Sequence, residues 1–139
     1  MIIGSIRDGI VIDHIPAGRG MELYTYLKLG DLDCEVALIK NAISEKMQKK
    51  DIIKIGAPIE LDYAILGFID RQITVNIIVD GQRAKKFHPA PPQTITQLIR
   101  CKNPRCITSC EQELPHVFRL SDAEHGVYRC LYCETKAEK

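Results

Sequence analysis

Cys101-Lys102-Asn103-Pro104-Arg105-Cys106 and, after twenty-three further residues, Cys130-Leu131-Tyr132-Cys133 decide the fold of the C-terminal part of this chain. Each stretch places two thiols at metal-ligand spacing, and two such pairs on separate turns can converge on the tetrahedral site that Zn²⁺ accepts. Few large apolar residues lie between the pairs, so a domain of under about 50 residues would lack a sufficient core without a metal. Four ligands leave no open position. The spacing therefore predicts one structural zinc ion.

The cysteine spacing alone leaves the ligand set open. Cys110 follows Cys106 by four residues, so these two could replace the first pair, and His116 or His125 could compete. We expect Cys110 and Cys34 to be plain thiols and the histidines to be loop residues. Six cysteines without an export signal are typical of a reducing cytosol, where clustered thiols bind metal instead of forming disulfides. We therefore expect a cytoplasmic protein.

The composition excludes several classes of protein. The 139 residues suffice for one modest domain or two small ones. Hydrophobic residues make up 45% and charged residues 27%, as in an ordinary folded chain. No apolar run reaches the roughly 20 residues that a membrane helix needs. The 19 basic residues nearly cancel the 18 acidic ones, so the chain has no overall field that would attract a polyanion.

A proline-rich segment divides the chain. Residues 89–92 read Pro-Ala-Pro-Pro, which is a stiff, extended sequence and a natural domain boundary. The four clustered cysteines described above all follow it. We therefore expect two domains, at residues 1–90 and 93–139.

The first domain alternates strand and helix signals. The predicted strands are Ile2–Ile12, Glu35–Ile43, Asp51–Ile55 and Ile73–Val79. One predicted helix begins with Pro16 in its first turn and ends at Gly30, and the other covers Leu61–Phe68. Asp80-Gly81 is a good hairpin turn into a short last strand. The order β-α-β-β-α-β predicts an α+β, ferredoxin-like sandwich with its helices on one sheet face.

The polar residues of this domain favour binding over catalysis. Asp13 and His14 end the first predicted strand, and several lysines cluster at residues 46–54 and 85–86. Cations converging with an imidazole would suit a phosphorylated ligand, although surface lysines are often merely solvated. On a regular strand Asp13 and His14 face opposite sides, which makes a poor acid–base pair. We expect a binding protein that is not an enzyme.

A zinc ribbon also allows a nucleic-acid hypothesis. Such proteins normally combine a basic patch with stacking aromatic residues. Phe118, Tyr128 and Tyr132 are present, but dense positive charge does not surround them. A zinc-ribbon nucleic-acid-binding protein and a free-standing nucleotide-sensing module therefore remain as alternatives, and we expect neither nucleic acid nor membrane as a partner.

Several segments together resemble one known family. They are Val11-Ile12-Asp13-His14-Ile15-Pro16-Ala17, Lys50-Asp51-Ile52-Ile53-Lys54-Ile55, Thr74-Val75-Asn76 and the array of Cys101, Cys106, Cys130 and Cys133. In this order and over nearly the whole chain, they resemble the regulatory chain of aspartate carbamoyltransferase. The resemblance implies a non-catalytic subunit of pyrimidine biosynthesis that forms a regulatory-chain homodimer. Its N-terminal allosteric domain would bind CTP as inhibitor, ATP as activator, and UTP. Its zinc ribbon, a small rubredoxin-like β domain, would dock on the catalytic chain.

The resemblance also implies roles for single residues. Asp13 would contact the ribose with help from Lys54, while His14 and Lys86 would face the phosphates. Lys50 would line the same site, and Ile6 and Val11 would form a wall beside the base or ribose. The ligands of the single structural zinc ion would be Cys101, Cys106, Cys130 and Cys133. Asn103 and Glu134, beside these ligands, would reach the catalytic chain.

Overall fold

The computed structural model describes residues 7–111 and 113–138 of the chain. Two compact units divide between Ala90 and Pro91. The elements of the first unit are β1 (Gly9–Pro16), α1 (Gly20–Tyr26), the 3-10 helix η1 (Leu29–Asp31), β2 (Val36–Ser44), β3 (Gln48–Ile55), α2 (Ala64–Ile69), β4 (Thr74–Val79) and β5 (Gln82–Phe87). The elements of the second unit are β6 (Thr94–Thr96), α3 (Ile107–Cys110), β7 (Val117–Asp122) and β8 (Val127–Cys130).

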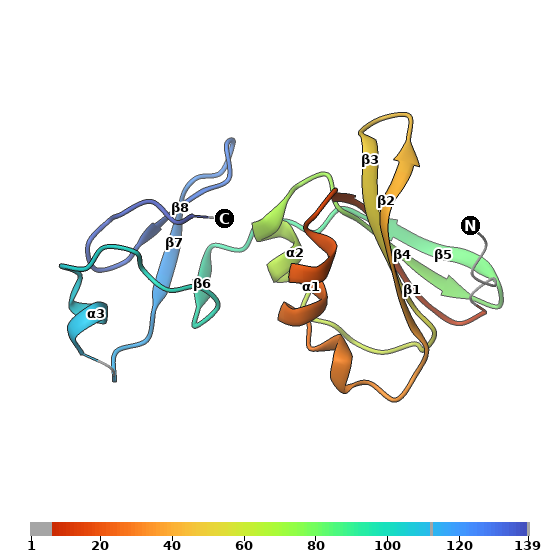
Figure 1. Cartoon of the computed structure of the whole chain (residues 1–139), viewed down its shortest axis with the longest axis horizontal. Helices are drawn as coiled ribbons and strands as arrows, with labels where there is room; N and C mark the ends of the chain where they lie inside the picture. Colours follow the sequence, from red (N-terminus) through yellow and green to blue (C-terminus); the bar gives the residue numbers. More distant parts are fainter. Residues whose placement is uncertain (1–6, 112, 139) are drawn as a thin grey trace. The chain divides into compact units, whose positions relative to one another are not determined.

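The first unit is an antiparallel sheet covered by helices on one face. Its strand order is β2-β3-β1-β4-β5, so the central strand is the first in sequence. Figure 1 shows α1 and α2 on the same side of this sheet. Side chains alternate across the regular parts of the strands, and Ile10, Ile12 and Val75 are among those buried on the helix side. The predicted α+β class with helices on one face is confirmed.

Two boundaries in the first unit differ from the prediction. Pro16 is the last residue of β1 instead of the first turn of a helix, and α1 begins only at Gly20. The first strand was predicted over Ile2–Ile12; the described strand begins at Gly9, and residues 1–6 lie outside the described part of the chain. The delayed helix start has a tertiary cause, because the backbone N–H groups of Gly18 and Gly20 donate to a buried carboxylate of β3.

That carboxylate belongs to Asp51, which is fully buried. Its Oδ2 accepts the N–H of Gly18 (3.1 Å) and of Gly20 (2.9 Å), and its Oδ1 accepts the N–H of Asn41 (3.0 Å). Both strands beside it carry a bulge at this level, between Ile12 and Ile15 in β1 and between residues 39 and 42 in β2. Asp51 therefore ties the β1–α1 turn and the bulge of β2 to the central part of the sheet.

The second unit is small. Its three-stranded antiparallel sheet has the order β6-β7-β8. Its buried side chains are few, and the largest are Phe118, Tyr128 and Ile95. A core of this size agrees with the expectation that a metal stabilises the domain. Among the described residues, no helix is long and apolar enough to cross a membrane.

Candidate functional site

A row of side chains crosses four strands on the face of the first sheet that the helices leave uncovered. Lys54 of β3 lies opposite Val11 of β1, Val11 lies opposite Asn76 of β4, and Asn76 lies opposite Lys86 of β5. Directly opposite residues of antiparallel strands share one face. We call this surface, with the neighbouring Asp13, His14, Lys50 and Thr74, the polar face. It brings together residues separated by up to 75 positions in the sequence.

The bulge in β1 places Asp13 and His14 on this same face. Ile12 and Ile15 are both fully buried on the other side, so the strand contains one extra residue between them. His14 is this extra residue, and its backbone has a left-handed conformation, φ 57°. The Asp13 carboxylate accepts the N–H of His14 (2.6 Å). The expectation that the two side chains face opposite sides holds only for a regular strand, and it is wrong here.

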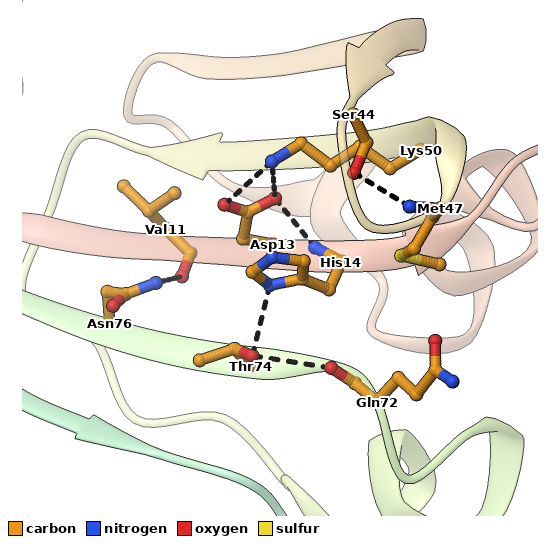
Figure 2. Close-up of polar contacts among 9 residues, drawn as sticks. All are labelled: Val11, Asp13, His14, Ser44, Met47, Lys50, Gln72, Thr74 and Asn76. Atoms are coloured by element: carbon orange, nitrogen blue, oxygen red, sulfur yellow. Dashed lines mark hydrogen bonds and ion pairs between the residues drawn. The ribbon is translucent and has the colours of Figure 1, made fainter.

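Figure 2 shows how neighbouring strands hold these two side chains. Lys50 Nζ lies 3.0 Å from Asp13 Oδ1, and both side chains are largely shielded from solvent. The ring nitrogen Nδ1 of His14 lies 3.2 Å from the Thr74 hydroxyl. The same hydroxyl lies 3.3 Å from the carbonyl oxygen of Gln72. Thr74 thus holds the ring against β4.

The surroundings of His14 disfavour the charged form of its ring. Burial is the largest cause that lowers the pKa of His14 below its usual 6.5. The charge of Asp13 raises this pKa, whereas Lys50, Lys46 and Lys86 lower it. The lysines thus act on the imidazole from two different strands and from the β2–β3 turn. The polar face is an electropositive site in which an added anion would stabilise the charged ring.

The register of β5 separates two consecutive lysines. Lys86 lies opposite Asn76 on the polar face, whereas Lys85 lies opposite Ile77 on the helix side of the sheet. The Lys85 ammonium sits 5.0 Å from the centre of the Phe87 ring, a cation–π distance. The register of β5 therefore puts Lys86, and not Lys85, on the polar face.

Two residues of the polar face, Thr74 and Asn76, were given no role from the sequence. Thr74 orients the His14 ring, and the Asn76 amide donates to the carbonyl of Val11 (3.4 Å). Lys46, which belongs to the lysine cluster noted in the sequence, contributes to the electropositive surroundings of His14. Strand alternation relative to Asp13 would have pointed to Thr74 and Asn76 only once the pairing of β1 with β4 was known. Ile6, predicted to form a wall of the site, lies outside the described residues.

The second unit brings four thiols together. The sulfur atoms of Cys101, Cys106, Cys130 and Cys133 all lie within 4.8 Å of one another. Cys101 and Cys133 sulfurs are 3.5 Å apart, and those of Cys106 and Cys130 are 3.7 Å apart. A tetrahedron with Zn–S bonds of about 2.3 Å has S···S edges of roughly 3.8 Å. The donor set and its spacing therefore fit a tetrahedral zinc ion.

The protonation of these thiols couples metal binding to proton release. Burial raises the pKa of Cys101 to about 12 and also raises that of Cys130. The hydroxyl of Thr135 is the main cause that lowers the pKa of Cys133, to about 6. Without metal, at least two sulfurs keep their protons at neutral pH. A metal ion must therefore displace protons as it binds.

The other cysteines and histidines that could have served as metal ligands do not belong to the sulfur cluster. Cys110 is exposed at the end of α3 and is outside the sulfur cluster. His116 Nδ1 accepts the N–H of Cys101 (3.3 Å), and the His125 ring pairs with the Asp122 carboxylate (2.8 Å) in the β7–β8 turn. Each histidine thus has a partner of its own. Cys34, the remaining cysteine, belongs to the first unit.

Asn103 and Glu134 flank the sulfur cluster. The Asn103 side chain accepts the N–H of Arg105 (3.0 Å) and so shapes the turn between the first two cysteines. Glu134 is exposed and has a left-handed backbone, φ 65°. Three large apolar side chains near the cluster are about half exposed, at 50% for Ile107, 49% for Leu131 and 41% for Tyr132. Each of the three is next in sequence to a cysteine of the cluster.

Comparison with known proteins decides between the interpretations. The family model "Aspartate carbamoyltransferase regulatory chain, allosteric domain" matches residues 1–90, and that of the "metal binding domain" of the same chain matches residues 93–139. The chain belongs to the family of aspartate carbamoyltransferase regulatory chains. Relatives of that name include the chain of Clostridium acetobutylicum, which is 52% identical over 96% of this chain and 92% of the relative. The relative from Clostridium tetani is 50% identical over 96% of this chain and 94% of the relative. The relative from Bifidobacterium longum is 41% identical over 99% of both chains.

Membership in the aspartate carbamoyltransferase regulatory chain family confirms two predictions. The protein is a regulatory chain and not a catalytic one. It combines an allosteric domain with a metal-binding domain, and the latter contains the four-cysteine cluster. As a regulatory chain of aspartate carbamoyltransferase, it has a catalytic chain as its partner.

Proposed function

We propose that the polar face binds the nucleoside triphosphates CTP, ATP and UTP, and that this binding controls the catalytic chain, with CTP inhibiting and ATP activating. The observation that carries the proposal is the row Lys54–Val11–Asn76–Lys86 across four strands. It combines cations at both ends with an apolar side chain and an amide between them. A nucleotide needs the same combination for its phosphates, its base and its ribose.

The proposed contacts are those that the family resemblance implies, and their side chains share the polar face. Lys86 and the ring of His14 face the phosphates, with Lys50 lining the same end of the face. Asp13 accepts from the ribose hydroxyls, assisted by Lys54, and Val11 packs against the base or ribose. A triphosphate carries about three to four negative charges. Because the whole chain has a formal net charge of only +1, the attraction must come from these local cations.

The second part of the proposal concerns the metal-binding domain. Cys101, Cys106, Cys130 and Cys133 hold one structural Zn²⁺, and Asn103 and Glu134 contact the catalytic chain. The exposed Ile107, Leu131 and Tyr132 extend that contact. The chain acts as a regulatory homodimer in the cytoplasm, in the pathway of pyrimidine biosynthesis. Each effector binds the two quaternary states of the assembled enzyme with different affinity, and so it shifts the populations of these states.

Lys86 and Lys85 provide the test of the nucleotide site. They are neighbours on one exposed strand, but only Lys86 lies on the polar face. Calorimetric titration of CTP and ATP into the full chain should show Lys86→Ala weakening binding about ten- to hundredfold, since a charge-assisted contact contributes roughly 1.5–3 kcal/mol. Lys85→Ala should bind as the wild type does. Equal affinities for Lys86→Ala and wild type would remove Lys86 from the site.

A further inference from the structure

The sulfur cluster has a second layer of contacts, made by two threonine hydroxyls. The Thr108 hydroxyl lies 3.1 Å from Cys106 Sγ, and the Thr135 hydroxyl lies 3.2 Å from Cys133 Sγ. Each threonine follows its cysteine by two residues, once on each side of the cluster. The two hydroxyls therefore touch one sulfur from each of the two cysteine pairs.

Four thiolates around one Zn²⁺ leave an excess of about two negative charges in a mostly buried site. Backbone N–H groups offset part of this charge: that of Asn103 points at the Cys101 sulfur, and those of Tyr132 and Cys133 point at the Cys130 sulfur. A metal-bound thiolate has lost its proton and can only accept a hydrogen bond. Both threonine hydroxyls must then donate to sulfur.

We propose that Thr108 and Thr135 are positioning residues of the metal centre, whose hydroxyls hold the thiolates of Cys106 and Cys133 and slow the release of the metal. This inference rests on the proposed zinc site and extends it from the four ligands to their supporting hydrogen bonds. Charge-assisted hydrogen bonds to a ligand fix its orientation and stabilise its anionic form.

The two threonines differ in burial, which ranks their effects. Thr108 is 4% exposed and Cys106 is 1% exposed, so water cannot replace the hydroxyl if it is removed. Thr135 and Cys133 are both partly exposed, and solvent can take over part of the contact. The Thr108 hydroxyl therefore contributes more than the Thr135 hydroxyl.

Valine has the shape of threonine without the hydroxyl, which makes Thr108→Val and Thr135→Val the variants of choice. Thr108→Ser keeps the hydroxyl and loses only the methyl group. Ser109→Ala is the control, because the Ser109 hydroxyl donates to the Asn103 carbonyl (2.9 Å) and not to a sulfur. The full chain is loaded with zinc, and metal release to an excess of chelator is timed. The Co²⁺-loaded chain provides the energy of the sulfur-to-cobalt charge-transfer band.

Thr108→Val should release zinc about tenfold faster than wild type, Thr135→Val should be faster by a smaller factor, and Thr108→Ser should stay within about twofold. The cobalt band should move to lower energy in both valine variants, because a thiolate without its hydrogen bond is oxidised more easily. Ser109→Ala should change neither measurement. If Thr108→Val fails to fold, the band of Thr135→Val decides the question.

If the valine variants release zinc at the wild-type rate and their cobalt band does not shift, this inference is overturned and the proposed zinc site is unaffected. Release from Thr108→Ser as fast as from Thr108→Val would overturn it too, because packing and not the hydroxyl would then matter. If the wild-type chain takes up neither zinc nor cobalt, the zinc site of the proposed function fails, and the inference fails with it.

Discussion

Lys50 and Asp13 form a partly buried ion pair, with 3.0 Å between Nζ and Oδ1, on adjacent strands of the polar face. The pair joins β3 to β1 at the level of the β1 bulge, where His14 turns onto the same face. Asp13 thus fixes the ammonium of Lys50 beside the imidazole before any ligand arrives. A site whose cation is already positioned loses less side-chain entropy when an anion binds.

Removing this cation should weaken nucleotide binding. Lys50→Met keeps most of the side-chain stem and deletes the charge, so the affinity for CTP and ATP should fall about ten- to hundredfold in a calorimetric titration. Lys40→Met is the control, since Lys40 is exposed on the edge strand β2. A Lys50→Met chain that binds CTP as tightly as the Lys40→Met chain would place the phosphates elsewhere.

His14 should make nucleotide binding depend on pH. Burial and the neighbouring lysines lower the pKa of the free ring below 6.5, and a bound triphosphate should raise it. Because the bound pKa then exceeds the free one, the gain in affinity is complete below the free-state pKa. It is lost as the pH rises through the bound-state pKa.

His14→Gln isolates this contribution from the protonation of the nucleotide's own phosphates. Titrations of both proteins between about pH 5.5 and 8 should show a steeper loss of affinity with rising pH for the wild type. Parallel curves for the two proteins would mean that the imidazole gains no proton on binding.

Asp51 should matter for stability more than an ordinary surface carboxylate. Asp51→Ala leaves the buried N–H groups of Gly18, Gly20 and Asn41 without their acceptor, so the free energy of unfolding should fall by about 3–5 kcal/mol. Circular dichroism in urea is the suitable measurement, since the chain has no tryptophan. The exposed Asp33 is the control, and Asp33→Ala should change the unfolding midpoint little. Similar midpoints for the two variants would contradict the role given to Asp51.

A side chain at Gly20 should destabilise the fold, because Gly20 packs directly against Asp51. A Cβ at this position would lie 2.8 Å from Asp51 Oδ2 and 2.7 Å from Leu38 Cδ1. Gly20→Ala must therefore push the carboxylate away from the N–H groups that donate to it. The substitution should lower the free energy of unfolding by about 1–3 kcal/mol. Gly30→Ala, where the nearest atom would be 3.5 Å away, should have a much smaller effect in the same urea titration. Equal losses at both glycines would contradict this packing argument.

The sequence predicted the features that depend on local pattern. The alternating apolar residues from Ile73 to Val79 and the spacing of the four cysteines are regular signals that need no knowledge of tertiary contacts. The α+β sandwich followed from their order along the chain. The metal-binding cysteine cluster followed from thiol chemistry, and the structure brings the four sulfurs together.

The bulges could not be predicted in this way. His14 and Asn41 are each the extra residue of a bulge, and both bulges lie beside Asp51 of the intervening strand. Whether a strand gains an extra residue depends on its partner strands, which no local pattern specifies. The start of α1 likewise depends on a carboxylate about thirty residues away, so the helix signal at Pro16 was misread.

Metal removal should unfold the second unit. Its apolar core is small, and ligand bonds should supply much of its folding free energy. Cys130→Ser should lose zinc, measured by atomic absorption, and should no longer co-purify with the catalytic chain. Cys110→Ser, which changes an exposed cysteine outside the cluster, should retain both properties. Zinc loss in Cys110→Ser with zinc retained in Cys130→Ser would show that the ligand set is different.

The most direct test of the central claim measures catalysis in the enzyme reconstituted from catalytic chains and this chain, at subsaturating substrate, while CTP or ATP is varied. CTP should lower the rate and ATP should raise it. With Lys86→Ala, the nucleotide concentration for half of either effect should rise about ten- to hundredfold, whereas Lys85→Ala should leave it unchanged. The account would be contradicted if the wild-type complex ignored both nucleotides, or if Lys86→Ala responded at the wild-type concentrations.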